Sequence, residues 1–196
     1  MKKIRTLLVL GCLASLICAC GFGEKVDTTT VFFDKDGEIQ ETIVEDFAQP
    51  YYDVEELKSD IQEEVSKYNA EVGTEEAVTL GDVELTDEKV ICVEMRFKTC
   101  GDYKAFNDRE LFWGTVAEAY SAGYEFTTMR DVGKEDVILS AKDVLEKGDM
   151  HIVILEEAQQ IVVPGEILYI SDGVSVIEED RAVNLNEGQK AFLLYD

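Results

Sequence analysis

The sequence predicts an α+β fold: an N-terminal ββαββ antiparallel sheet with one covering helix, then short helices, then a C-terminal all-β part. Three observations lead to this fold class. One long amphipathic segment lies at 53–72, and β-rich segments flank it on both sides. After residue 150, short β-rich segments are separated by Pro, Gly, Asp and Ser at close intervals. Strands that follow one another through tight turns favour antiparallel pairing.

The first predicted element is a β-hairpin formed by residues 28–33 and 38–47. The tetrapeptide between them, DKDG at 34–37, indicates a tight turn, because glycine takes the positive φ that such a turn requires. An alternative is a calcium loop of the EF-hand type. That loop has glycine at its sixth position and glutamate at its twelfth, whereas glycine is fourth here. The turn is therefore the favoured interpretation.

A helix is predicted over residues 53–72. Asp53 has the position of an N-cap, Glu56 follows three residues later, and Gly73 provides the C-terminal stop. Apolar residues recur every three or four positions and form one stripe, which is typical of a helix packed on a core. The stripe consists of Val54, Leu57, Ile61, Val65, Tyr68 and Val72.

A second hairpin is predicted over 77–86 and 88–99. In its second strand, Ile91, Val93, Met95 and Phe97 share one face, and polar residues alternate with them, as in a half-buried antiparallel strand. Gly81 shifts the alternation of the first strand, as a β-bulge does. Residues 28–99 thus form the predicted ββαββ unit.

The rest of the chain divides into a mixed region and a β-rich region. Residues 100–150 are expected to connect the two β parts through short helices at 102–107, 115–122 and 141–146. Residues 151–196 form a small β-rich part, either a sandwich or a sheet added to the first unit.

The first twenty residues have the organisation of an export signal. A basic start, MKKIR, precedes an apolar run at 6–17 that is shorter than the roughly 20 residues a membrane span needs. The sequence Ile17-Cys18-Ala19-Cys20 resembles a bacterial lipobox. This resemblance implies cleavage of a signal peptide at 1–19, lipidation of Cys20 and a tether at 20–27. Alternatives are an ordinary secretory signal and an uncleaved anchor.

The predicted location is therefore the extracytoplasmic face of a cell membrane, through a lipid anchor. Residues 1–19 include three basic and no acidic residues, so their removal changes the formal charge from −24 to −27. A charge this negative excludes nucleic acid as a partner and favours a divalent cation or a basic partner. The favoured interpretation of the charge is nevertheless an acidic, well-solvated surface.

Only two cysteines, Cys92 and Cys100, follow the leader. An exported chain often joins such a pair in a disulfide. Here the residues between them are predicted to be extended, which separates the ends by roughly 26 Å, whereas a bridge needs Cα atoms about 5.5–6 Å apart. We expect the two thiols not to be bridged.

Two segments carry a further resemblance. Residues 46–52 and the run at 164–171, PGEILYIS, resemble small surface lipoproteins of anaerobic Gram-positive bacteria. The resemblance implies a location at the cell surface and implies nothing about catalytic activity.

Motifs of the common catalytic sites are absent from the sequence. His151 is the one histidine and is expected to be structural; there is no Gly-x-Ser-x-Gly elbow, paired zinc-ligand spacing or glycine-rich phosphate loop. We therefore predict no catalytic residue, no metal site and no cofactor. Among 42 acidic residues, a carboxylate pair of the glycoside hydrolase type remains an alternative.

Aromatic residues concentrate between 103 and 126. Buried, they form a core that joins two sheets; exposed, they offer the flat platforms of a sugar- or partner-binding surface. Trp113 and Tyr120 are the candidate ligand-binding residues. The favoured function is a non-catalytic binding module for a protein or glycan. Alternatives are a structural or regulatory envelope component acting through protein contacts, and an acidic-dyad hydrolase.

Overall fold

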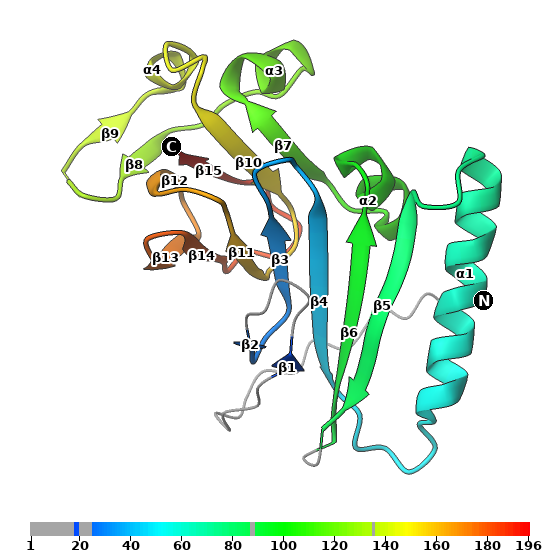
Figure 1. Ribbon diagram of the computed structural model, residues 1–196. Helices are drawn as coiled ribbons and strands as arrows, with labels where there is room; N and C mark the ends of the chain where they lie inside the picture. Colours follow the sequence, from blue (N-terminus) through cyan, green and yellow to red (C-terminus); the bar gives the residue numbers. More distant parts are fainter. Residues whose placement is uncertain (1–17, 20–24, 87–88, 135) are drawn as a thin grey trace.

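The computed structural model describes residues 18–19, 25–86, 89–134 and 136–196 (Figure 1). The predicted α+β class is confirmed, since two large sheets and four helices make up most of the described chain. The predicted lipidation site, Cys20, and most of the leader lie outside the described residues. A small pair, β1 (Cys18–Ala19) and β2 (Lys25–Val26), precedes the main fold.

A seven-stranded sheet contains the predicted ββαββ unit. Its order is β13-β14-β11-β3-β4-β6-β5, and all neighbours are antiparallel except β11 and β3. The strands are β3 (Thr30–Phe33), β4 (Ile39–Asp46), β5 (Val78–Leu85), β6 (Val90–Phe97), β11 (Gln160–Val162), β13 (Val174–Glu178) and β14 (Arg181–Asn184).

A six-stranded antiparallel sheet has the order β7-β10-β15-β12-β8-β9. Its strands are β7 (Leu111–Thr115), β8 (Met129–Asp131), β9 (Ile138–Leu139), β10 (His151–Leu155), β12 (Ile167–Ser171) and β15 (Ala191–Tyr195). The strands after residue 150 are thus divided between both sheets. Pro164 and Gly165 lie at a crossing point, because they connect β11 of one sheet with β12 of the other.

Four helices complete the fold: α1 (Val54–Val72), α2 (Cys100–Asn107), α3 (Val116–Ser121) and α4 (Ala141–Leu145). These confirm the helix predicted over 53–72 and the three short helices. Helix α1 packs along β5, and α2 contacts both β6 and β7, so it bridges the two sheets (Figure 1).

The main core lies between the two sheets and α1. Its buried side chains come from both sheets, for example Val31, Met95 and Phe97 from one and Val153 and Leu193 from the other. A second core covers the opposite face of the six-stranded sheet beneath α3 and α4. The tertiary structure therefore joins the N-terminal and C-terminal strands through one continuous apolar layer.

Both predicted hairpins are present. Asp34 Oδ1 accepts hydrogen bonds from the Asp36 and Glu38 N–H groups, and Gly37 has a φ of +83°, as the turn interpretation requires. The register of β5 against β6 shifts between Leu80 and Val83, which confirms the bulge at Gly81.

Strand β6 differs from the half-buried strand that its alternation predicts. Its apolar face lies in the main core, but Cys92 and Glu94 on the other face are also buried. Cys92 packs with Val26 and Phe32, and Arg96 forms an ion pair with Glu94 at 2.8 Å. The alternation of polar and apolar residues predicted the two faces of β6 correctly. It did not indicate that Cys92 and Glu94 on the polar face are buried as well.

The expectation for the cysteines is confirmed. Cys100 is free, so it is not joined to Cys92.

Asp53 caps α1, and its replacement provides the first test of the fold. The Asp53 carboxylate accepts hydrogen bonds from the N–H groups of Glu55 and Glu56, at 2.9 and 3.1 Å. We expect Asp53→Ala to lower the free energy of unfolding by about 1 kcal/mol, because two N–H groups of the first turn lose their acceptor. Urea denaturation measures this value. Asp60→Ala, in the middle of the same helix, is the control and should change it less.

Candidate functional site

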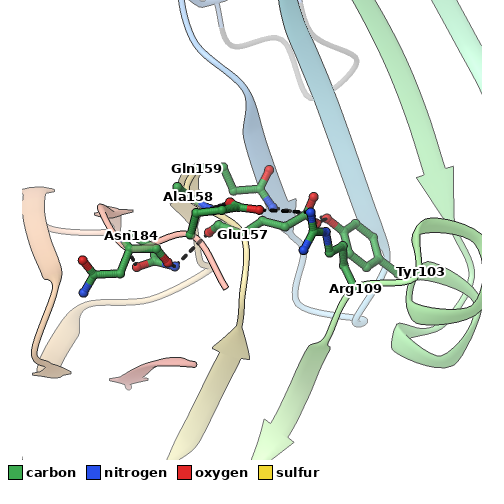
Figure 2. A network of polar contacts seen from close by, with 8 residues as sticks. Tyr103, Arg109, Glu157, Ala158, Gln159 and Asn184 are labelled. Atoms are coloured by element: carbon green, nitrogen blue, oxygen red, sulfur yellow. Dashed lines mark hydrogen bonds and ion pairs between the residues drawn. The ribbon is translucent and has the colours of Figure 1, made fainter. Parts of the chain in front are cut away.

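A cluster of buried polar side chains lies where α2 meets both sheets. Tyr103 of α2 is completely buried, Glu41 of β4 is 2% exposed and Gln159 is 4% exposed. Glu157 and Gln159 come from the loop between β10 and β11, which connects the two sheets. We refer to Glu41, Tyr103, Asn107, Glu157 and Gln159 as the tyrosine cluster; Figure 2 shows part of it.

The Tyr103 hydroxyl is the centre of the cluster. It forms hydrogen bonds with Glu41 Oε1 at 2.9 Å and with Glu157 Oε2, and Gln159 Nε2 donates to it at 3.2 Å. Asn107 Nδ2 donates to the second oxygen of Glu41 at 3.5 Å. One hydroxyl thus connects a strand, a helix and the loop between the sheets.

The alternation of β4 explains how a carboxylate reaches this position. Ile39, Glu41 and Ile43 share the face of β4 that contacts the main core, and Glu41 pairs with Met95 of β6 and Val31 of β3. An isolated carboxylate in such a place is costly, so the hydrogen bonds from α2 are what make the position tolerable.

A second layer holds the same loop from the outside. Arg109 forms an ion pair with Glu187 at 3.1 Å, and Glu187 also accepts a hydrogen bond from the Ala158 N–H at 2.9 Å. Asn184 Nδ2 donates to the Glu157 carbonyl at 2.9 Å (Figure 2). The loop is therefore fixed from its buried side by Tyr103 and from its exposed side by β14 and the residues after it.

Burial raises the pKa of Tyr103 well above its usual value of about 10, and the nearby carboxylates of Glu41 and Glu157 raise it further. The pKa of Tyr195 is raised to about 12, also chiefly by burial. These hydroxyls stay protonated in the folded protein at pH values where an unfolded chain ionises them.

This difference predicts a loss of stability at alkaline pH. Because the folded pKa of Tyr103 exceeds the unfolded one, its stabilising effect is complete below about pH 10 and declines as pH rises further. Above about pH 10, the free energy of unfolding falls by about 1.4 kcal/mol per pH unit for one such tyrosine. Urea unfolding at several pH values between 8 and 11.5 measures it. Tyr103→Phe should show a shallower decline than the unchanged protein, and equal slopes would contradict the assignment.

The carboxylates of Glu41 and Glu157 are close enough to be compared with a hydrolytic pair. Both contact one hydroxyl oxygen, so the two contacting oxygens are at most about 6 Å apart. Retaining glycoside hydrolases place two carboxyl groups about 5–5.5 Å apart, but with a sugar between them. Here the Tyr103 hydroxyl occupies that space, and Glu41 is almost fully buried. The arrangement holds the loop in place through the Tyr103 hydroxyl.

The candidate residue Trp113 is half-buried and packs against the main core. Its Nε1 donates to the Tyr195 hydroxyl at 2.7 Å, and its ring stacks on His151, with ring centres 5.8 Å apart. The turn of the first hairpin covers it, since a Cβ added to Gly37 would lie 2.6 Å from the indole ring. His151, at the start of β10, also stacks on Tyr195.

The candidate residue Tyr120 lies elsewhere. It is 61% exposed on α3, which covers the opposite face of the six-stranded sheet. Trp113 and Tyr120 are therefore separated by that sheet and do not form one surface. Most of the other aromatics between 103 and 126 join one of the two cores, as the core interpretation predicts.

The surface cavities of the described chain include the following two. One, of about 380 Å³, lies between α1 and β5; its lining residues are Gln62, Val65, Ser66, Asn69, Glu75, Val78, Thr79 and Leu80. The other, of about 660 Å³, lies beside the crossing point at Pro164 and Gly165, and four acidic residues, Glu166, Glu178, Glu179 and Asp180, line it. The sequence indicated neither cavity, because each combines residues from separate elements.

Within residues 18–19, 25–86, 89–134 and 136–196, no group of three or more His, Cys, Asp or Glu side chains is arranged to hold a metal ion. In the same ranges, no helix combines the length and apolar character that crossing a bilayer requires. Comparisons with protein-family models, curated proteins and solved structures found no match for this chain.

Proposed function

We propose that this chain is a lipid-anchored protein of the extracytoplasmic membrane face, and that its globular part is a non-catalytic binding module for a protein or glycan partner. The anchor rests on the leader: a basic start, a short apolar run and a small residue, Ala19, directly before Cys20. The binding role rests chiefly on one observation, the open groove between α1 and the edge strand β5. The closed tyrosine cluster weighs against the hydrolase alternative.

Labelling of cells with a palmitate analogue tests the anchor. We expect the unchanged protein to be labelled and Cys20→Ala to lose the label, because the cysteine thiol is the acceptor of the diacylglycerol group. Cys18→Ala, two residues away in the same leader, is the matched control and should retain the label. Equal labelling of the unchanged protein and Cys20→Ala would contradict the proposal.

A variant in the tyrosine cluster distinguishes a binding module from a hydrolase. If Glu41 and Glu157 acted as a catalytic pair, Glu157→Gln would abolish turnover of some glycan. The proposal expects the unchanged protein to release no product from a broad panel of oligosaccharides and wall fragments. Product formation that depends on Glu157 would replace the binding module with a hydrolase.

A further inference from the structure

We propose that the groove between α1 and β5 binds an extended basic peptide segment of a partner protein, which adds to β5 as a further strand. This inference rests on the proposed binding function and assigns it a site and a ligand chemistry. It combines three features: an edge strand, a groove beside it and a charged surface around it.

Strand β5 forms one edge of the seven-stranded sheet, next to β6 and with no strand on its other side in the described chain. The Val78 N–H donates to Asn69 Oδ1 at 3.0 Å, and the Val78 carbonyl accepts from Asn69 Nδ2 at 2.8 Å. Both backbone groups of Val78 therefore point away from β6, toward α1. Backbone direction repeats every second residue along a strand, so the N–H of Leu80 points the same way.

The Asn69 side chain already forms hydrogen bonds with this edge in the way that a neighbouring strand would. Its side-chain amide has the same donor and acceptor pair as a peptide group, and it is 8% exposed at one end of the groove. From Val78 the groove continues past Thr79 and Leu80, with Gln62 and Ser66 of α1 on the opposite wall. An added strand would extend along β5 from the position that Asn69 occupies.

The charge around the groove selects the ligand. Between residues 53 and 84, which include α1 and nearly all of β5, the chain has eleven acidic and two basic residues, and all eleven acidic residues are exposed. Glu75 lines the groove itself, and Asp82 and Glu84 project from β5. Lysine or arginine on alternate positions of an added strand would face these carboxylates.

The same charge argues against pairing of two copies of this chain. Edge strands with charged side chains and a bulge resist edge-to-edge association, and β5 has both, at Asp82, Glu84 and Gly81. Two antiparallel copies of β5 would bring like charges together, whereas a basic strand would meet opposite charges. Recognition through backbone groups also favours a peptide over a glycan.

Binding of a model peptide to the full-length chain in detergent tests the proposal. The probe is a capped, fluorescent heptapeptide of alternating lysine and valine. We expect a dissociation constant of about 10–100 μM at low salt and about tenfold weaker binding in 0.5 M salt. Replacing lysine by glutamate in the peptide, or N-methylating its alternate backbone amides, should abolish binding.

Variants on the protein locate the site. Ser66 is exposed on α1 and lines the groove, so Ser66→Arg adds bulk and positive charge there without a helix penalty. We expect it to weaken peptide binding at least about tenfold. Ser175→Arg makes the same change on β13, at the far edge of the same sheet, and should change binding less than about twofold. Saturating peptide should also slow hydrogen exchange of the Leu80 amide.

Three results would overturn the inference: no binding of the lysine peptide, equal binding to the unchanged protein and Ser66→Arg, or an equal loss in Ser175→Arg. Site-specific photo-crosslinking in cells separates this failure from failure of the binding function. A partner captured from position 175 and not from position 66 would preserve the binding function and reject the groove. Capture from neither position, together with no peptide binding, would reject both.

Discussion

Tyr103→Phe is expected to lower the free energy of unfolding by about 3 kcal/mol at pH 7. The substitution keeps the buried ring and removes one hydroxyl, which contacts Glu41 and Glu157 and accepts a hydrogen bond from Gln159. A hydrogen bond to a charged group in a buried site contributes about 1.5–3 kcal/mol, and removing the hydroxyl also leaves two carboxylates close together. Urea denaturation of the purified protein measures the change.

Tyr120→Phe is the matched control, because it removes the same hydroxyl from a side chain that is 61% exposed. It should change the free energy of unfolding by less than about 0.5 kcal/mol. A Tyr103→Phe variant as stable as the control would show that the tyrosine cluster does not fasten the loop between the sheets.

Gly37→Ala is expected to destabilise the fold by about 2–4 kcal/mol. Gly37 has a φ of +83°, which an alanine adopts only with strain, and the added Cβ would lie 2.6 Å from the Trp113 ring. The ring has little freedom to move, because its Nε1 is bonded to Tyr195 and its face stacks on His151. Thermal or urea unfolding gives the value.

Gly188→Ala separates the effect of backbone strain from the effect of the contact with Trp113. Gly188 has a similar φ of +73°, but no atom lies within 4 Å of the position of its added Cβ. It should therefore show the backbone strain alone, about 1 kcal/mol. Equal losses at positions 37 and 188 would mean that the contact between the first turn and Trp113 adds nothing to stability.

Local patterns predicted the elements of this fold well. The apolar stripe at 53–72, its cap at Asp53 and its stop at Gly73 are properties of one continuous segment, and α1 has the predicted bounds within one residue. The same holds for the turn at 34–37 and the bulge at Gly81, where one glycine determines the local backbone. Such signals act over a few residues and are visible in the sequence.

The pairing of distant segments was harder to predict from the sequence. The parallel pairing of β11 with β3 joins residues about 130 positions apart, and no local pattern indicates it. Glu41 is the clearest case within the site. Its place between Ile39 and Ile43 on the apolar face of β4 was the available signal, because a carboxylate at a core position requires partners. Those partners come from α2 and from the loop at 156–159, which the sequence does not bring together.

The aromatic residues illustrate a third limit. Composition indicated a concentration of rings between 103 and 126, but it could not separate exposed from buried ones. Trp113 and Tyr120 are only seven residues apart, yet a strand and the start of a helix lie between them, so they face opposite sides of one sheet. The structure instead offers the groove beside β5 as the candidate binding site.

A thermal-shift screen of the full-length chain tests the binding function most directly. The panel contains basic and acidic peptides, oligosaccharides, wall fragments and divalent cations, with a chelator as a separate arm. A ligand at a hundred times its dissociation constant stabilises the folded protein by about 2.7 kcal/mol. We expect a member of the panel, most of all a basic peptide, to raise the melting temperature in a dose-dependent way. We also expect that ligand to be recovered chemically unchanged. A flat response to every member, or consumption of the ligand that causes the shift, would contradict a non-catalytic binding module.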